Sequence, residues 1–172
     1  MDSFTTNKDK LFEKVENSLT TIPFSKDDKW GFKNKNVIVI EPKYDFVRAF
    51  DENYARVCIN NKWGLIDNKG NHLTEIIYDS IHPIITNNDK SLRHSFVYLN
   101  GKKGIINSIG NITVPVIYDD IKNNGEFLEI KIGDKVGFCN YENVIIPSIY
   151  DKLSYYFFHQ YKYSEAERDN II

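Results

Sequence analysis

The sequence predicts an all-β protein made of four similar repeats, and three observations support this. Strand-forming residues are abundant, including 11 Tyr and 11 Phe among the 172 residues. A glycine recurs along the chain, and a Tyr-Asp pair follows each such glycine by thirteen or fourteen residues. A regular period of this kind is the signature of a repeat architecture. The glycines are Gly31, Gly64, Gly104 and Gly137, and the pairs begin at Tyr44, Tyr78, Tyr118 and Tyr150.

The centre of each repeat predicts a β-hairpin. In the clearest copy, which runs from Lys62 to Asn71, Asp67 opens a type I turn and Gly70 takes the left-handed backbone position. Asn or Asp stands three residues after the glycine in every repeat, and such side chains favour turns. The left-handed positions expected from this pattern are Asn36, Gly70, Gly110 and Asn143.

Two further strands are expected around this turn. The strand after it is apolar and β-branched, and in three repeats it is expected to end at a proline, which cannot donate to a ladder. Glu75 stands in the corresponding place of the second repeat. Another strand, which alternates apolar and polar residues, precedes the strand that contains the glycine. A two-residue hinge such as Asn60-Asn61 joins this strand to the glycine strand. Each repeat therefore holds three short antiparallel strands. The prolines are Pro42, Pro115 and Pro147.

The run from Lys62 to Asn71, followed by an apolar strand and Tyr-Asp, resembles the WG (KWG) repeat of many bacterial proteins. Four copies cover about residues 20–153. Trp30 and Trp63 keep the tryptophan, whereas Lys103 and Val136 replace it. The resemblance implies a β-rich scaffold that mediates interactions, and it carries no catalytic motif onto this chain.

The full expectation is an all-β fold in which four three-stranded antiparallel WG-repeat units form a rolled solenoid, a barrel-like or a propeller-like meander. The rolled solenoid is preferred because repeats of about 33 residues are short for four-stranded propeller blades. Residues 1–172 are expected to form a single domain. A short N-terminal helix is expected over residues 1–19, where Leu11, Val15 and Leu19 are spaced by four. Residues 154–172 are expected to supply a capping strand and a tail.

Composition argues against several classes of partner. A net charge of -2 gives no basic face for a nucleic acid. The sequence shows no leader pattern and no run of about 18 apolar residues, so neither export nor a membrane partner is expected. Cys58 and Cys139 are too few for a disulfide framework and are expected to be buried thiols in the cytoplasm.

No constellation of residues predicts catalysis, so the chain is expected not to be an enzyme. The four histidines lack the spacing of metal pairs, and no motif for a cofactor, a metal or a nucleophile is present. The repeated Tyr-Asp pairs have two interpretations. Asp caps the turn that leaves the strand while Tyr packs between repeats, or the carboxylates together bind a cation or a basic ligand.

The repeat is broken once, between residues 82 and 94, where a seven-residue insertion lengthens the spacing to 40. Insertions of this kind often lie on a binding face, although an inert loop is an equal alternative. Apolar residues with a basic rim predict a surface for a protein partner, and the basic rim favours an acidic one. The residues expected to bind the partner are Ile84, Ile85, Lys90, Leu92, Arg93 and His94.

The sequence thus favours a non-catalytic protein-protein interaction module in the cytoplasm. One alternative is a cytosolic immunity protein that neutralises a toxin, since the chain is compact, acidic and without a site of its own. The other alternative is a hydrolase or transferase with an unrecognised site. Oligomeric state is left open.

Overall fold

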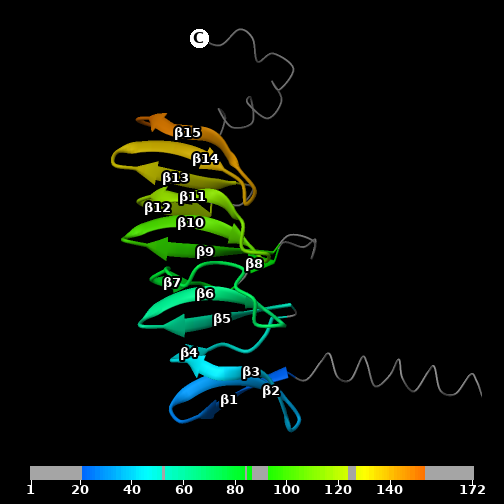
Figure 1. Ribbon diagram of the computed structural model, residues 1–172. Coiled ribbons are helices and arrows are strands. Elements are labelled where there is room, and N and C mark those ends of the chain that lie inside the picture. Colours follow the sequence, from blue (N-terminus) through cyan, green and yellow to red (C-terminus); the bar gives the residue numbers. More distant parts are fainter. Residues whose placement is uncertain (1–20, 52, 84, 87–92, 124–126, 154–172) are drawn as a thin grey trace, which may run out of the picture. The chain divides into compact units, whose positions relative to one another are not determined.

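The computed structural model describes residues 21–51, 53–83, 85–86, 93–123 and 127–153. These residues form fifteen β-strands and no helix, which confirms the all-β class (Figure 1). The helix expected over residues 1–19 and the cap expected over 154–172 lie outside the described residues. In the described part of the chain, no helix is long and apolar enough to cross a membrane.

The first two sheets have three strands each. The first has the order β1-β2-β3 and the second the order β4-β5-β6. Their strands are β1 (Thr21–Lys26), β2 (Lys29–Asn34), β3 (Val37–Tyr44), β4 (Phe46–Val47), β5 (Tyr54–Ile59) and β6 (Lys62–Asp67).

The third sheet has the order β11-β10-β9-β7, with β8 also paired to β9, and the fourth has the order β12-β13-β14-β15. The described strands thus form four separate sheets, and none closes into the barrel-like alternative. The strands are β7 (Ser80–Ile81), β8 (Ile85–Thr86), β9 (Arg93–Leu99), β10 (Lys102–Asn107), β11 (Ile112–Tyr118), β12 (Asp120–Asn123), β13 (Leu128–Ile132), β14 (Lys135–Cys139) and β15 (Val144–Tyr150).

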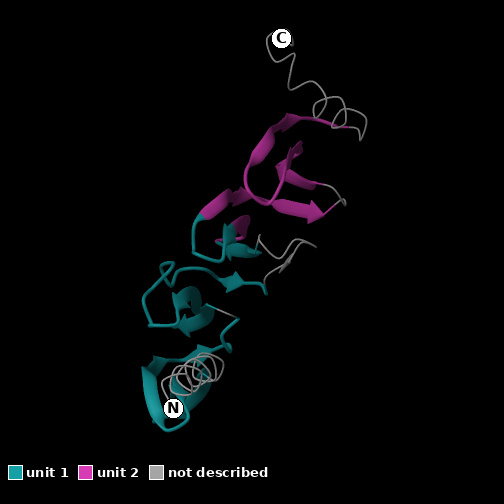
Figure 2. Cartoon of the chain, turned by 90° about the vertical axis from the view of Figure 1, so that its right-hand side faces the viewer, with its two compact units in different colours: residues 1–99, 106–111 teal, residues 100–105, 112–172 magenta. Residues whose placement is uncertain are grey.

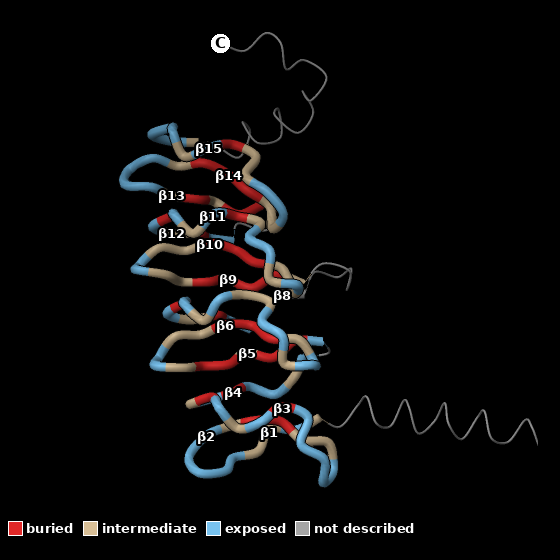
Figure 3. The backbone as a smooth tube through the Cα atoms, viewed as in Figure 1, coloured by how far each residue is buried: buried red, intermediate tan, exposed pale blue. Residues whose placement is uncertain are grey.

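The chain divides into two compact units, which Figure 2 shows in separate colours. One comprises residues 1–99 with 106–111, and the other comprises residues 100–105 with 112–172. In the first unit, Phe32 and Ile40 of the first sheet join Val57 and Ile66 of the second in one buried cluster. Figure 3 shows that buried residues lie mainly within the strands, whereas the hairpin turns are exposed.

Each Tyr-Asp pair is followed by a short strand that joins the next sheet. β4, β7 and β12 come directly after the first three pairs and pair with β5, β9 and β13. The segment expected to be a connector is therefore an edge strand of the following sheet. Three strands per repeat is therefore an incomplete description. In the first three repeats, a fourth short strand follows Tyr-Asp and belongs to the sheet of the next repeat.

The second repeat lacks a continuous returning strand. Isolated bridges join Ile66 to His72 and Trp63 to Tyr78 instead. Between these bridges the Thr74 hydroxyl accepts a hydrogen bond from the Leu65 amide at 2.9 Å, where a regular ladder would use a backbone carbonyl. The less regular exit expected around Glu75 is thus present, and a side chain supplies part of the ladder.

The returning strands do not end at their prolines, which corrects the expectation from the sequence. β3, β11 and β15 continue for two or three residues beyond Pro42, Pro115 and Pro147. In β3 and β15 the pairing register shifts at the proline. Because a bulge leaves a residue outside the ladder, the missing N–H of proline costs no hydrogen bond there.

The repeated glycine is required by this bulge. Trp30 pairs with Tyr44 and Phe32 with Ile40, so Gly31 alone faces three residues of β3. A Cβ atom on Gly31 would lie 2.4 Å from the Ile40 carbonyl oxygen, and one on Gly137 would lie 2.4 Å from the Ile146 carbonyl oxygen. The glycine therefore lets the returning strand approach closely.

In the first three repeats, the hinge between the first two strands has the left-handed backbone of a type I′ turn at both of its residues. The φ angles of Asn60 and Asn61 are 51° and 60°, and the first and third repeats follow the same pattern. In the fourth repeat only Gly133, at 56°, has a positive φ. Asn, Asp and Gly tolerate this region best, so the sequence pattern identified the hinges correctly.

The second turn differs between repeats. Gly70 and Gly110 have φ angles of 85° and 90°, as expected. Asn36 and Asn143 do not adopt a positive φ, and in the first repeat Lys35 does so instead, at 52°. The first and fourth repeats have thirteen rather than fourteen residues from the glycine to the tyrosine. Their turns are therefore one residue shorter, and they lack the left-handed glycine of the longer turn.

Candidate interaction surface

The insertion that predicted a partner site is only partly described. Ile84, Lys90 and Leu92 lie outside the described residues. Ile85 belongs to β8 and its backbone pairs with that of His94 in β9. The loop expected at this point therefore contains a strand, and three predicted residues, Ile85, Arg93 and His94, come together in one strand pair.

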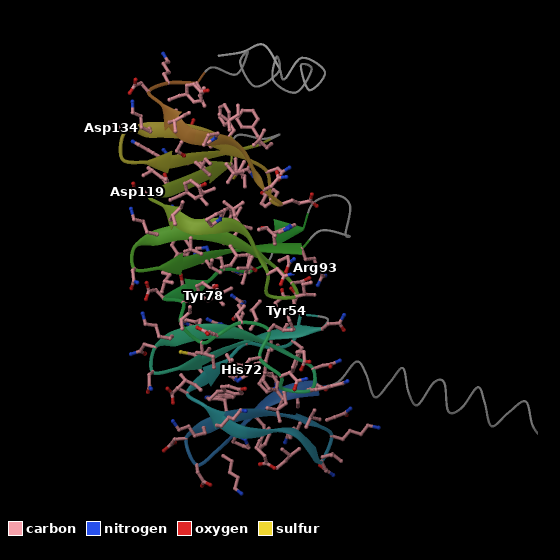
Figure 4. All side chains as sticks on the ribbon, turned by 45° about the horizontal axis from the view of Figure 1, so that its top comes forward. Tyr54, His72, Tyr78, Arg93, Asp119 and Asp134 are labelled. Atoms are coloured by element: carbon pink, nitrogen blue, oxygen red, sulfur yellow. The ribbon has the colours of Figure 1, made fainter. Side chains whose placement is uncertain are left out.

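The side chains of Arg93 and His94 are engaged in the structure. The Arg93 guanidinium forms an ion pair with Asp51 at 3.0 Å, and its side chain is 17% exposed. Asp51 also accepts a hydrogen bond from the Tyr54 hydroxyl at 2.8 Å (Tyr54 and Arg93 are labelled in Figure 4). Burial, followed by this hydrogen bond, raises the pKa of Tyr54. His94 is buried, with 4% of its surface exposed. Partner binding by the insertion stays a prediction.

In every repeat, a lysine stands two residues before the repeated glycine, and it forms an ion pair with the aspartate of the Tyr-Asp pair. Lys29 contacts Asp45 at 2.5 Å and Lys102 contacts Asp119 at 2.6 Å. Lys62 with Asp79, and Lys135 with Asp151, form the same pair. The ion pair therefore joins the strand that contains the glycine to an aspartate 16 or 17 residues after the lysine.

Two of these aspartates, Asp45 and Asp119, also cap the hairpin of the next repeat. Asp45 accepts a hydrogen bond from the Asn60 amide, and Asp119 accepts one from the Gly133 amide, each at 2.7 Å. The Asp45 amide in turn donates to the Cys58 carbonyl at 2.9 Å. The hydrogen bonds from the lysine and from the backbone hold the pKa values of both carboxyl groups below the usual range.

These contacts favour the structural interpretation of the Tyr-Asp pairs, with one correction. Asp45 and Asp119 do not cap the turn that leaves their own strand; each caps the hinge of the following hairpin. Asp119 and Asp134, beside one such hinge, are labelled in Figure 4. In the described part of the chain, no three His, Cys, Asp or Glu side chains gather as a metal site would require.

Both cysteines are buried, as the sequence predicts. Burial raises the pKa of Cys139 to about 12. Burial and then the neighbouring Asp45 carboxylate raise the pKa of Cys58. A thiol that stays protonated is a poor nucleophile.

An exposed group of aromatic rings lies in the first two repeats. The rings of Trp30 and Phe46 are 6.1 Å apart between centroids, and those of Phe46 and Trp63 are 6.0 Å apart. Phe46 is 40% exposed, and both tryptophans are partly exposed. Phe46 and Trp63 flank Cys58 in register across three neighbouring strands. We call Trp30, Phe46 and Trp63 the aromatic row.

The third repeat places charges at the same positions. Lys103 replaces the tryptophan and Asp120 replaces Phe46, and their side chains form an ion pair at 2.5 Å. Hydrogen bonding to Lys103 lowers the pKa of Asp120. The fourth repeat has Val136 at the tryptophan position and still forms its hairpin. A tryptophan is therefore not required for the repeat to fold.

From the sequence, the two tryptophans are recognised as the signature of the repeat and are expected to pack between repeats, whereas Phe46 is not singled out. The available signal was its position directly after a Tyr-Asp pair, which is Ser80, Asp120 or Lys152 in the other repeats. Because the repeating pattern ends at Tyr-Asp, the spacing does not indicate that the next residue meets the tryptophan.

An arginine adjoins the aromatic row. The guanidinium of Arg48 lies 5.0 Å from the centre of the Phe46 ring, a cation–π contact. The Arg48 amide donates to the Arg56 carbonyl at 2.8 Å, so the two arginines are neighbours on adjacent segments. Arg56 is half-buried and donates to the Ile81 carbonyl at 2.9 Å.

Part of the chain matches a known repeat family. Residues 30–63 and 63–102 each match the WG containing repeat family. Together the matches run from Trp30 in β2 to Lys102 in β10, and they include all three residues of the aromatic row. No curated protein matches the sequence, and no solved structure matches the chain.

Proposed function

We propose that this chain, of which residues 30–102 match the WG containing repeat family, is a non-catalytic module that binds another protein. The observation that carries the proposal is the aromatic row. The third and fourth repeats form their hairpins with Lys103 and Val136 at the tryptophan position, so the hairpin itself does not require a tryptophan. Trp30 also packs against the buried core of the first two sheets, and its partly exposed surface is available in addition. Partly exposed tryptophans are enriched at the centres of protein interfaces.

The repeated polar residues support a scaffold rather than a reaction centre. The Lys-Asp pairs bind each other and the backbone of the next hairpin, which uses their charges for assembly of the fold. A general acid or nucleophile would instead need a side chain directed toward a substrate, with a pKa near the working pH. The proposal also retains the expectation of a cytoplasmic protein that keeps its two thiols reduced.

The test is recovery of the partner from the native source. The full chain carrying an affinity tag should retain a specific protein, identified by mass spectrometry, and the purified pair should elute together in size-exclusion chromatography. Failure to form any such pair, together with turnover of a substrate by the purified chain, would contradict the proposal and favour the enzyme alternative.

A variant separates the insertion from the aromatic row. Residues 87–92 are replaced with a short Gly-Ser turn, and Arg93 is kept because it holds Asp51. A loop of this length costs little free energy to change, so the fold should persist. If the insertion is the site, partner affinity should fall at least about tenfold, or 1.4 kcal/mol. Unchanged affinity would remove the insertion from the interface.

A further inference from the structure

The proposed function does not say which chemical class of partner binds. The geometry and the charges around the aromatic row indicate that class. The rings do not form a flat platform. Trp30 and Phe46 meet at 58°, and Phe46 and Trp63 meet at 73°. A flat ligand such as a sugar ring stacks best on a ring that offers its whole face. Steeply tilted rings offer edges and notches, which suit an apolar side chain.

The charges beside the row are mostly neutralised. Lys29 and Lys62, which precede the two tryptophans, are paired with Asp45 and Asp79. These four charges cancel. These two ion pairs therefore favour neither an acidic nor a basic partner.

Arg48 is the exception. Among the described residues, its side chain contacts the Phe46 ring and forms no ion pair with a carboxylate. Arg56 lies next to it and uses one donor on a backbone carbonyl. Asp51, three residues after Arg48 in the sequence, is already paired with Arg93. The edge of the aromatic row therefore carries an excess of positive charge.

From this arrangement we propose that the aromatic row and Arg48 form a docking surface for an acidic peptide segment of a partner protein. An apolar side chain of the segment rests against Phe46 and Trp63, and a nearby carboxylate pairs with the Arg48 guanidinium. Charge-assisted hydrogen bonds from arginine to carboxylate fix orientation as well as charge. Docking also removes the exposed ring surface from water. This inference rests on the proposed protein-binding function.

The chain itself supplies the design of the key variant. Trp63→Lys with Ser80→Asp rebuilds in the second repeat the Lys103-Asp120 pair of the third. Trp30→Lys with Phe46→Asp does the same in the first repeat. Each variant places Lys and Asp at the positions that Lys103 and Asp120 occupy in the third repeat. The variants therefore remove the rings but keep a side-chain arrangement that the repeat accommodates. Circular dichroism and thermal unfolding verify the fold.

The probe is a phage-displayed library of random 12-residue peptides, selected on the immobilised full chain. Enriched peptides should carry an apolar residue close to one or more Asp or Glu. Synthetic copies without tryptophan should change the intrinsic fluorescence of the protein, whose two tryptophans both belong to the row. Affinity should fall at least tenfold in the Trp63→Lys, Ser80→Asp variant and in Arg48→Gln.

Several outcomes would overturn the docking surface. They are enrichment of basic or uncharged peptides, no enrichment, equal binding to the ring variants, or a dimer in sedimentation experiments that dissociates in those variants. A native partner that binds the ring variants and the unchanged chain equally would also overturn it, while the proposed protein-binding function would stand. Loss of the proposed function is recognised separately, by the absence of any partner in the recovery experiment.

Discussion

Lys103 and Asp120 form an ion pair at 2.5 Å at the positions that Trp30 and Phe46 occupy in the first repeat. The same backbone thus supports either an aromatic contact or a salt bridge between the WG position and the residue after Tyr-Asp. A repeat that tolerates such different side chains at two surface positions can vary its surface without changing its hairpin.

Unfolding free energy should fall at acid pH through the repeated aspartates. Hydrogen bonds from Lys29 and Lys102 lower the pKa values of Asp45 and Asp119 in the folded protein. Their contribution is fully present above the unfolded pKa of about 4 and is lost as pH falls through the lowered folded pKa. Denaturant titrations from pH 7 to pH 2 measure it. Asp45→Asn with Asp119→Asn should be less stable at pH 7 and should show a shallower pH dependence; an unaltered slope would contradict the assignment.

The two left-handed glycines should respond differently to asparagine. At Gly70 an added Cβ lies 3.3 Å from the Ile40 side chain, whereas at Gly110 it lies 2.1 Å from the Leu73 carbonyl oxygen. Asparagine tolerates the left-handed region, so Gly70→Asn should cost about 1 kcal/mol. Gly110→Asn should cost about 3 kcal/mol or more, because backbone has to move. Thermal or denaturant unfolding measures both, and equal costs would refute the close approach.

Strain at Gly70 itself can be tested with valine. A β-branched residue is strongly disfavoured at a φ of 85°, so Gly70→Val should cost on the order of 1 to 3 kcal/mol, more than Gly70→Asn. Gly101→Ala is the control, since no atom lies within 4 Å of its added Cβ and only the positive φ opposes the substitution. A Gly70→Val protein that unfolds at the wild-type temperature would disprove the turn.

Two buried tyrosines should differ in their need for the hydroxyl group. The Tyr44 hydroxyl is buried and has no hydrogen-bond partner among the described residues. Tyr44→Phe should therefore be neutral or stabilising by up to about 1 kcal/mol. Tyr54 donates to Asp51, so Tyr54→Phe should destabilise by about 1.5 kcal/mol. Chemical denaturation of both variants decides this, and a marked loss of stability in Tyr44→Phe would reveal an unrecognised partner.

Thiol reactivity should report on the aromatic row. Cys139, with a pKa of about 12, should react slowly with a chromogenic disulfide reagent at pH 8 in the folded protein. Cys58 lies in register between Phe46 and Trp63. The Trp63→Lys, Ser80→Asp variant should therefore expose Cys58 and accelerate its reaction, while Cys139 serves as the internal control. An unchanged rate at Cys58 would show that the ring does not cover the thiol.

Much of the architecture was determined by the sequence itself, because it depends on local backbone preferences. Paired hinge residues such as Asn60 and Asn61 favour a left-handed turn wherever they occur, and alternating strands on either side complete the hairpin. The glycines of the longer turns, Gly70 and Gly110, follow the same logic. These features require no knowledge of distant neighbours.

The tertiary structure decided how the repeats use their remaining residues. Pro42 lies within a strand because a bulge opposite Gly31 frees it from the ladder, and Asp45 caps a hinge that begins fifteen residues later. Phe46 acquires its place between two tryptophans in the same way. Such contacts depend on the register between segments far apart in the chain, and a shift of one residue would turn every side chain to the opposite face. Periodicity alone could therefore predict the hairpins, but not which side chains meet between them.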